Sequence, residues 1–347
     1  TVGAGVGRNA TDGDQFNIKA GTAEILAASL TLATYGTPTA PAPLILRGYT
    51  AAANDGGVGE IDCGGFTMWA NNAYDYIVMA YLEIHTFGDN TGIYLDAGIV
   101  LFRCEVHRGA SAPNNRSLVY LGSDSVVIGC YLHDPGTGTS HCLECVANNS
   151  TIIANFIHNG SESTSHAVLI SGNANVVGNI VQCAGVAQDG MHITNPKLVL
   201  GNIVYNSAAG TDRGIYCSLS NLTHVVMNNI IVGFSGIGGD GIQYVNVGVA
   251  GHNAFYNNTA PYTVSDQTFV GLTANDVTLA ADPFTNAAGG DFSLTAAAKT
   301  ALASKGFPVD YLGAAAATVS NLNIGPIQLA ATAPVAATRG RLIIPRR

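Results

Sequence analysis

Charged residues are scarce in this chain of 347 residues, at 11%, whereas a typical soluble domain carries about a quarter. The scarcity argues against a helical protein rich in Glu and Lys. The 14 Lys and Arg residues are outnumbered by 23 Asp and Glu residues. The resulting net charge of −9 excludes a general nucleic-acid surface.

Long apolar runs are also missing. No stretch reaches the length of about twenty apolar residues that crosses a bilayer, so membrane insertion is not expected. No signal peptide opens the chain. Because the sequence begins at Thr1 rather than Met, what precedes it stays open.

Cysteines are few and odd in number, which argues against a disulfide scaffold. Most of them lie inside apolar, strand-like runs, as buried free thiols do. We therefore expect no disulfide and assembly in a reducing cytoplasm. The seven are Cys63, Cys104, Cys130, Cys142, Cys145, Cys183 and Cys217.

Glycine and asparagine are abundant, and asparagine recurs inside apolar runs. Asn202 interrupts "LVLGNIVYNS", although a lone polar side chain in a core costs roughly 1–3 kcal/mol unless it is hydrogen-bonded. Similar segments recur every 23 to 27 residues, which is the mark of a stacked-repeat protein. One column of their alignment reads Cys104, Cys130, Asn155, Asn179, Asn202, Asn229 and Asn253.

Each repeat also holds a second short strand, such as "GMHI" at 190 or "GIYC" at 214. Short strands at a fixed spacing, without helices between them, predict an all-β, right-handed parallel β-helix, in which each strand stacks on its equivalent in the next coil. At the ~4.8 Å strand spacing, stacked asparagine amides satisfy one another. We therefore expect a structural ladder of Asn155, Asn179, Asn202, Asn229 and Asn253.

The chain divides into four parts by pattern. Residues 1–60 predict an N-terminal cap and opening coil, and residues 61–265 the β-helix itself. Residues 266–312 predict a C-terminal cap whose Ala-rich stretch 294–306 forms a short helix on the end of the coil. Residues 313–347 are of low complexity and end in "RGRLIIPRR", which predicts an extended arm.

The coil pattern resembles right-handed parallel β-helix proteins of the pectate-lyase-like superfamily. Two stretches narrow the resemblance. "GDQFNIKAGT" with "YGTPTAPAPLILRGYTAAANDGG" looks like the opening region of β-helix proteins of tailed bacteriophages and some environmental bacteria. "DPFTNAAGGDFSL" resembles the closing motif of many bacterial β-helix proteins. The resemblance implies a virion fibre, spike or decoration protein.

Outward side chains of the second strand form a row that carries the glycan-binding candidates. In the superfamily, carbohydrate binds along this strand face, and Tyr and His rings suit sugars; the alternative is that any surface strand favours Tyr. The candidates are Tyr94, Tyr120, Glu144, His192, Tyr216 and Gln243, with Leu169 between them.

The sequence gives weaker support for catalytic residues than for the glycan-binding candidates. Glycosidases need two carboxylates roughly 5 to 9.5 Å apart, and Asp189 and Asp212 precede strands in adjacent repeats, as does Asp240. Asp-Gly before a strand is equally ordinary turn chemistry. Arg213 is the best-placed arginine for a lyase, and Lys197 stands alone beside a strand. The residue set of polygalacturonases is absent.

Histidines at 85, 107, 133 and 158 occupy one position in four successive repeats. Four in line do not form a tetrahedron, so we expect a stack of neutral rings rather than a metal site. His141, Cys142 and Cys145 resemble a zinc half-site, but positions i and i+3 of a strand face opposite sides. No metal and no other cofactor is predicted.

Two functions from different classes remain. The first is a structural virion protein of a tailed bacteriophage, assembled with other virion proteins or with copies of itself and able to bind a host-surface polysaccharide. The second is an extracellular or tailspike polysaccharide lyase or glycoside hydrolase that acts on an acidic polysaccharide. Neither involves nucleic acid.

Overall fold

The computed structural model describes residues 13–305 apart from 22, 29, 32–41, 71–75, 89–90, 109–116, 137–140, 160–165, 186–188, 196–197, 209–211, 219–223, 246–247, 265–269 and 304. The arm expected at 313–347 and the candidate Lys197 lie outside the described residues. Among those described, no helix has both the length and the apolarity to cross a membrane.

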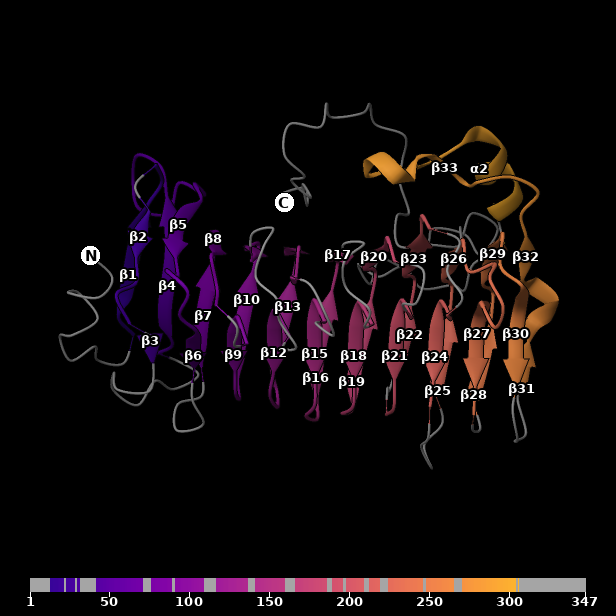
Figure 1. The fold of residues 1–347 in the computed structure, drawn as a ribbon, viewed down its shortest axis with the longest axis horizontal. Coiled ribbons are helices and arrows are strands. Elements are labelled where there is room, and N and C mark those ends of the chain that lie inside the picture. Colours follow the sequence, from indigo (N-terminus) through magenta and orange to yellow (C-terminus); the bar gives the residue numbers. More distant parts are fainter. Residues whose placement is uncertain are drawn as a thin grey trace.

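Three long parallel sheets run side by side along the molecule, as Figure 1 shows. Each coil contributes one strand to each sheet, and every strand pairs with its equivalent in the next coil. This arrangement is a parallel β-helix and confirms the predicted fold class.

Sheet A has eleven strands in the described part of the chain. They are β1 (Gln15–Lys19), β4 (Leu44–Tyr49), β7 (Ile77–Ala80), β10 (Ile99–Phe102), β13 (Val126–Ile128), β16 (Ser150–Ile153), β19 (Ala174–Val177), β22 (Leu198–Leu200), β25 (His224–Met227), β28 (Gly248–Gly251) and β31 (Val270–Leu272).

Sheet B likewise has eleven described strands. They are β2 (Glu24–Ile25), β5 (Gly59–Asp62), β8 (Leu82–His85), β11 (Glu105–His107), β14 (Tyr131–His133), β17 (Phe156–Asn159), β20 (Ile180–Cys183), β23 (Ile203–Asn206), β26 (Ile230–Val232), β29 (Ala254–Tyr256) and β32 (Val277–Thr278).

Sheet C has ten described strands. They are β3 (Leu30–Thr31), β6 (Met68–Ala70), β9 (Ile93–Leu95), β12 (Val119–Leu121), β15 (Leu143–Cys145), β18 (Val168–Ile170), β21 (Met191–Ile193), β24 (Ile215–Cys217), β27 (Asp240–Tyr244) and β30 (Ala260–Val264). Parallel pairing begins with β1 and β4, inside the segment expected to be a cap.

Alternation along each strand builds the core, because successive side chains point to opposite faces. In sheet B, the inward positions stack Val106, Leu132, Ile157, Val181 and Val204 on one another, all fully buried. All seven cysteines are free and buried in the same way. The core is therefore a continuous column of aliphatic and thiol side chains.

The asparagine ladder lies at the corner between sheets A and B, where the predicted residues form one buried column. Oδ1 of Asn202 accepts from both N and Nδ2 of Asn179, at 2.9 and 3.0 Å. Asn202 in turn donates to Oδ1 of Asn229, and the same pattern joins the rest of the column. The prediction of this ladder is confirmed.

A left-handed residue precedes each ladder position and makes the corner. Gly178 and Gly201 have φ values of 65° and 66°, and Ala154 adopts the same conformation with a φ of 53°. Glycine accepts this region at no steric cost. The recurrent Gly-Asn pair is therefore one device, in which glycine turns the chain and asparagine bonds to the next coil.

Residues other than asparagine continue the ladder at both ends. At its start, N of Cys104 lies 3.4 Å from Sγ of Cys130, and N of Cys130 donates to Asn155. At its far end, Oδ1 of Asp276 accepts from N of Asn253 at 2.8 Å, and Oδ2 accepts from the Tyr262 hydroxyl. Asp276 was not recognised as a ladder member in the sequence, although it lies one repeat after Asn253.

The C-terminal cap folds back over the outer side of sheet B (Figure 1). It consists of two 3-10 turns (Thr273–Asn275 and Ala287–Gly289), the hairpin β33 (Phe284–Asn286) and β34 (Asp291–Leu294), and helix α2 (Ala296–Leu302). The helix lies within the predicted range, and the Thr295 hydroxyl caps it.

The placement of this cap differs from the expectation that it closes the end of the coil. Phe284, Phe292 and Leu302 pack on Ile203 and Ile230 from successive coils. The cap therefore covers a flank of the β-helix, because apolar side chains follow the ladder asparagines on the outer face of sheet B.

We expect Asn202→Leu to destabilise the protein strongly. Leucine leaves N of Asn179 and the carbonyl oxygen of Val176 without their present partners. Each buried group left unpaired costs about 1–3 kcal/mol. Denaturant unfolding measures the loss. The matched control is Asn148→Leu, which removes an exposed hydrogen bond to Asn173 and should cost less than about 1 kcal/mol. Equal midpoints for the two variants would contradict the ladder's role.

Candidate functional site

The predicted row of outward side chains forms along sheet C. Its members pair in register from coil to coil, and each is half-buried between fully buried neighbours. The row reads Tyr94, Tyr120, Glu144, Leu169, His192, Tyr216 and Gln243. The Tyr94 and Tyr120 rings stack with centroids 4.5 Å apart. These residues will be called the sheet C row.

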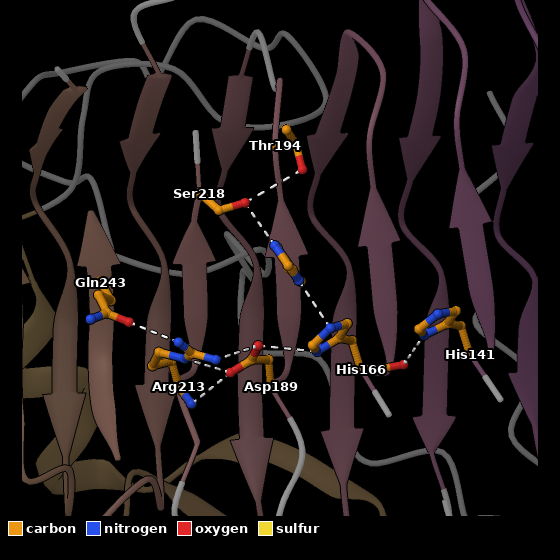
Figure 2. A network of polar contacts seen from close by, with 8 residues as sticks. His141, His166, Asp189, Thr194, Arg213, Ser218 and Gln243 are labelled. Carbon is orange, nitrogen blue, oxygen red and sulfur yellow. Dashed lines mark hydrogen bonds and ion pairs between the residues drawn. The ribbon is translucent and has the colours of Figure 1, made fainter. Parts of the chain in front are cut away.

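A second column runs beside the row, three residues earlier in each repeat. Backbone bonds define it, since Leu118 donates to the carbonyl of His141 and Gly190 to that of Arg213. We call it the corner column, and Figure 2 shows its polar side chains meeting between strands of sheet C. Its members are Ser117, His141, His166, Asp189, Arg213 and Asp240.

Asp189 and Arg213 form the centre of the corner column. Nε and Nη2 of Arg213 donate to Oδ1 and Oδ2 of Asp189 at 2.8 and 3.0 Å, and the Arg213 backbone N donates to Oδ1. Nη1 of Arg213 reaches Gln243, and the guanidinium lies 3.8 Å from the centre of the Tyr216 ring. Such a fork is the strongest geometry for a carboxylate.

Asp189 is only 1% exposed, so its charge depends on these partners. Burial alone would raise the pKa of Asp189, but His166 and Arg213 outweigh burial and hold this pKa below its ordinary value. The carboxylate is therefore ionised at neutral pH and fixed in position.

A chain of imidazoles continues from Asp189. Nδ1 of His166 lies 3.0 Å from Oδ2 of Asp189, in an ion-pair contact that is poorly aligned for a hydrogen bond. Nε2 of His166 lies 2.9 Å from Nδ1 of His192, and Nε2 of His192 lies 2.7 Å from the Ser218 hydroxyl. Thr194 lies 3.4 Å from that hydroxyl.

Within this chain of imidazoles, the pKa of His192 is strongly lowered. Burial and the neighbouring His166 lower the pKa of His192 to about 4, against the pull of Asp189 in the other direction. His192 is therefore a neutral imidazole at pH 7. Burial also lowers the pKa of His141, whose Nδ1 donates to the carbonyl of His166.

Asp189 and Asp212, the candidate pair of catalytic carboxylates, lie in different surroundings. Asp189 is held by Arg213, its equivalent in the next coil, and Asp212 lies one residue outside the corner column. Burial, with a contribution from the charge of Asp189, raises the pKa of Asp212. The catalytic roles of Asp189, Asp212 and Arg213 stay predictions.

On sheet B, His85, His107 and His133 stack as expected, and His158 pairs in register with His133. Centroid distances are 5.3 Å from His85 to His107 and 4.7 Å from His107 to His133. A carboxylate column that was not recognised in the sequence accompanies the rings, because Glu83 lies 3.4 Å from His107 and Glu105 lies 3.2 Å from His133. Each pair joins adjacent coils.

Among the residues that the structure describes, two groups of three side chains have metal-ligand chemistry. In Glu105, His107 and His133 the rings are nearly parallel, so one ion cannot lie in both ring planes. In His166, Asp189 and His192 the carboxylate already binds the Arg213 guanidinium, whose charge would repel a cation. Cys142 and Cys145 contact different carbonyl oxygens, those of His158 and Ala147.

His166, Thr194 and Ser218 were missed in the sequence, and His141 was considered only as part of a zinc half-site. The signal was present, because the alignment that gives the sheet C row also gives the corner column three positions earlier. Polar residues before a strand suggested turns, and spacing alone does not show whether such side chains bond along the axis.

We expect Arg213→Gln to destabilise the fold, because it leaves the buried Asp189 carboxylate without its fork. Removing one partner of a buried ion pair costs about 3–5 kcal/mol. Chemical unfolding at pH 7 measures the loss, with Lys299→Gln as a control at an exposed cation. A loss no larger than that of the control would show that the pair is not structural.

We also expect acid to destabilise the wild type partly through His192. Between pH 6.5 and about 4 the unfolded chain takes up a proton at this residue while the folded chain does not. Stability therefore falls as the pH falls through this window. His192→Gln should lose less stability than the wild type between pH 6.5 and 4.5 in thermal unfolding. Identical pH dependence would contradict the lowered pKa.

Comparison with known proteins supports the architecture. No family model and no curated protein sequence matches the chain. Among solved structures, pectate lyase Pel9A is 12% identical, with 94% of this chain and 90% of that chain covered and a TM-score of 0.55. The alginate lyase AlyF-OU02 in complex with G6 is 16% identical, with coverage of 76% and 58% and a TM-score of 0.46.

A tailspike protein of E. coli bacteriophage HK620, in complex with a pentasaccharide, is 14% identical, with coverage of 77% and 60% and a TM-score of 0.40. The chain thus spans about three fifths of the length of the last two proteins. At 12% identity, the likeness to pectate lyase Pel9A extends to the fold alone. The chain has the parallel β-helix fold that pectate lyase Pel9A also has.

Proposed function

We propose that this protein binds a polysaccharide along sheet C. The observation that carries the proposal is the sheet C row, which presents hydroxyl, imidazole, carboxylate and amide groups in register over seven coils. Their ~4.8 Å repeat suits an extended chain of sugars lying along the axis. Burial and the neighbouring Tyr94 raise the pKa of Tyr120 to about 12, so its hydroxyl stays a neutral donor.

The other two faces fit this role less well. The C-terminal cap covers much of the outer side of sheet B. On sheet A, Val177, Leu200 and Met227 form an apolar cluster separate from the main core. Ile153, Leu198 and Val225 lie partly buried against it, and such an apolar surface suits contact with protein rather than with sugar. Sheet C therefore offers the polar, half-exposed surface that a glycan requires.

The virion assignment is a proposal that rests on the resemblance of the opening region to that of β-helix proteins of tailed bacteriophages. In this account the protein is a fibre, spike or decoration protein of a tailed bacteriophage. Its β-helix is a durable scaffold, since axial hydrogen bonds leave few free strand edges. Copies of the same chain or other virion proteins would pack on the apolar face of sheet A.

A second candidate is an enzyme, a polysaccharide lyase or glycoside hydrolase acting on an acidic polysaccharide at an extracellular location or on a tailspike. The observation in its favour is the polar network around Asp189 and Arg213 beside the sheet C row. A glycosidase is less well supported than a lyase, because Asp189 is already bound by arginine. New unsaturated or reducing ends after incubation with acidic polysaccharides would establish this activity.

We expect Tyr120→Ala to weaken polysaccharide binding by roughly tenfold or more, because it removes one of the aromatic rings of the row. Binding is measured by affinity electrophoresis against a panel of bacterial surface polysaccharides. Tyr131→Ala is the matched control, since Tyr131 is a half-buried, outward tyrosine on sheet B. Equal losses in both variants, or no loss in either, would contradict binding on sheet C.

A further inference from the structure

Ser218 follows β24 directly and ends the chain of polar side chains that begins at Asp189. The order is Asp189, His166, His192, Ser218, with successive contacts of 3.0, 2.9 and 2.7 Å. Each comes from a different coil, except that Asp189 and His192 share one. Figure 2 shows Ser218 between this chain and Thr194.

One set of proton positions satisfies the contacts along the whole chain. With a proton on Nδ1 of His166, which faces the Asp189 carboxylate in an ion-pair contact without hydrogen-bond alignment, Nε2 of His166 is left to accept. Nδ1 of His192 must then donate to that Nε2, which leaves Nε2 of His192 as an acceptor. Its partner is the Ser218 hydroxyl, which therefore donates. Every proton is thus directed from Ser218 towards Asp189.

This is the arrangement that activates a serine, in which a base takes the hydroxyl proton and a further group orients the base. We propose that Ser218 is the nucleophile of an ester-cleaving site, with His192 as the general base and with His166 and Asp189 as positioning residues. The substrate class is an ester-linked acyl group. Its assignment to O-acylated sugars rests on the proposed binding of polysaccharide along sheet C.

The reaction consists of two acyl transfers. Oγ of Ser218 attacks the ester carbonyl carbon, and its proton passes to Nε2 of His192. The tetrahedral adduct collapses, the bond between the acyl carbon and the sugar oxygen breaks, and that oxygen takes the proton. Water then attacks the acyl-serine and gives a proton to His192. The carboxylic acid leaves, and the proton returns to Ser218.

Two neighbours support the charges that develop. The imidazolium of His192 is stabilised through His166 by the Asp189 carboxylate, which Arg213 holds in place. The Thr194 hydroxyl, 3.4 Å from the Ser218 hydroxyl, is placed to donate to the oxyanion. Tyr216, in the sheet C row on β24 and two residues before Ser218, would place a bound sugar beside the nucleophile.

The test uses the full chain and two probes that need no polysaccharide. A fluorophosphonate labels activated serines, and p-nitrophenyl acetate reports ester hydrolysis. We expect the label on Ser218 and a fall of at least about a thousandfold in kcat/KM for Ser218→Ala. Ser171→Ala is the matched control, because Ser171 occupies the equivalent position two coils earlier and should react as the wild type does.

The positioning role of His166 has its own readout. Burial and the protonated form of His166 lower the pKa of His192, and Asp189, Arg213 and His141 are the other charged or titratable groups acting on it. His166→Gln should therefore move the acid limb of the kcat/KM profile to higher pH, which a merely structural role would not do.

The proposal is overturned if the fluorophosphonate leaves the folded chain unlabelled, if it labels another residue, or if Ser218→Ala hydrolyses the ester within about threefold of the wild-type rate. Failure of the proposed function is distinguishable. Labelling of Ser218 without binding of any O-acetylated polysaccharide upholds the esterase site and removes its glycan substrate. Binding of a polysaccharide by a chain whose Ser218 is not labelled upholds the proposed function and removes the esterase site.

Discussion

Hydrogen bonding along the axis, between equivalent residues of successive coils, is the constraint on which the rest of this structure depends. Backbone groups form these axial hydrogen bonds within the three parallel sheets. At the sharpest corner, asparagine amides bond to the next coil, and Asp276 closes the column at its far end. A corner that recurs at one position in every coil keeps all other positions in register.

Register has a chemical consequence, because it places side chains of the same position about one strand spacing apart, ~4.8 Å. Like charges at that distance repel, so columns of charged residues need alternating signs. The corner column meets this need by placing Asp189 between His166 and Arg213. On sheet B, a glutamate of the preceding coil lies beside His107, and another lies beside His133. The polar network on sheet C is therefore a product of stacking, and the same stacking gives it a fixed geometry.

The repeat pattern was enough to predict the fold, the ladder and the sheet C row, because one residue type or one alternation at a fixed spacing has a direct structural meaning. The corner column was not predicted, since His141, His166, Asp189 and Arg213 share no chemistry and each alone is compatible with a turn. Ser218 was missed for a related reason, because its importance comes from His192 in the preceding coil. The position of the C-terminal cap depends on Ile203 and Ile230, whose outward direction follows only from the register.

The central claim is that sheet C is the polysaccharide-binding face. A crystal structure of the chain with an oligosaccharide that it binds in solution tests this claim most directly. The account predicts sugar residues in contact with the sheet C row between Tyr94 and Gln243, with the sugar chain running along the axis of the β-helix. An oligosaccharide bound on sheet A or on sheet B, with the sheet C row empty, would contradict it.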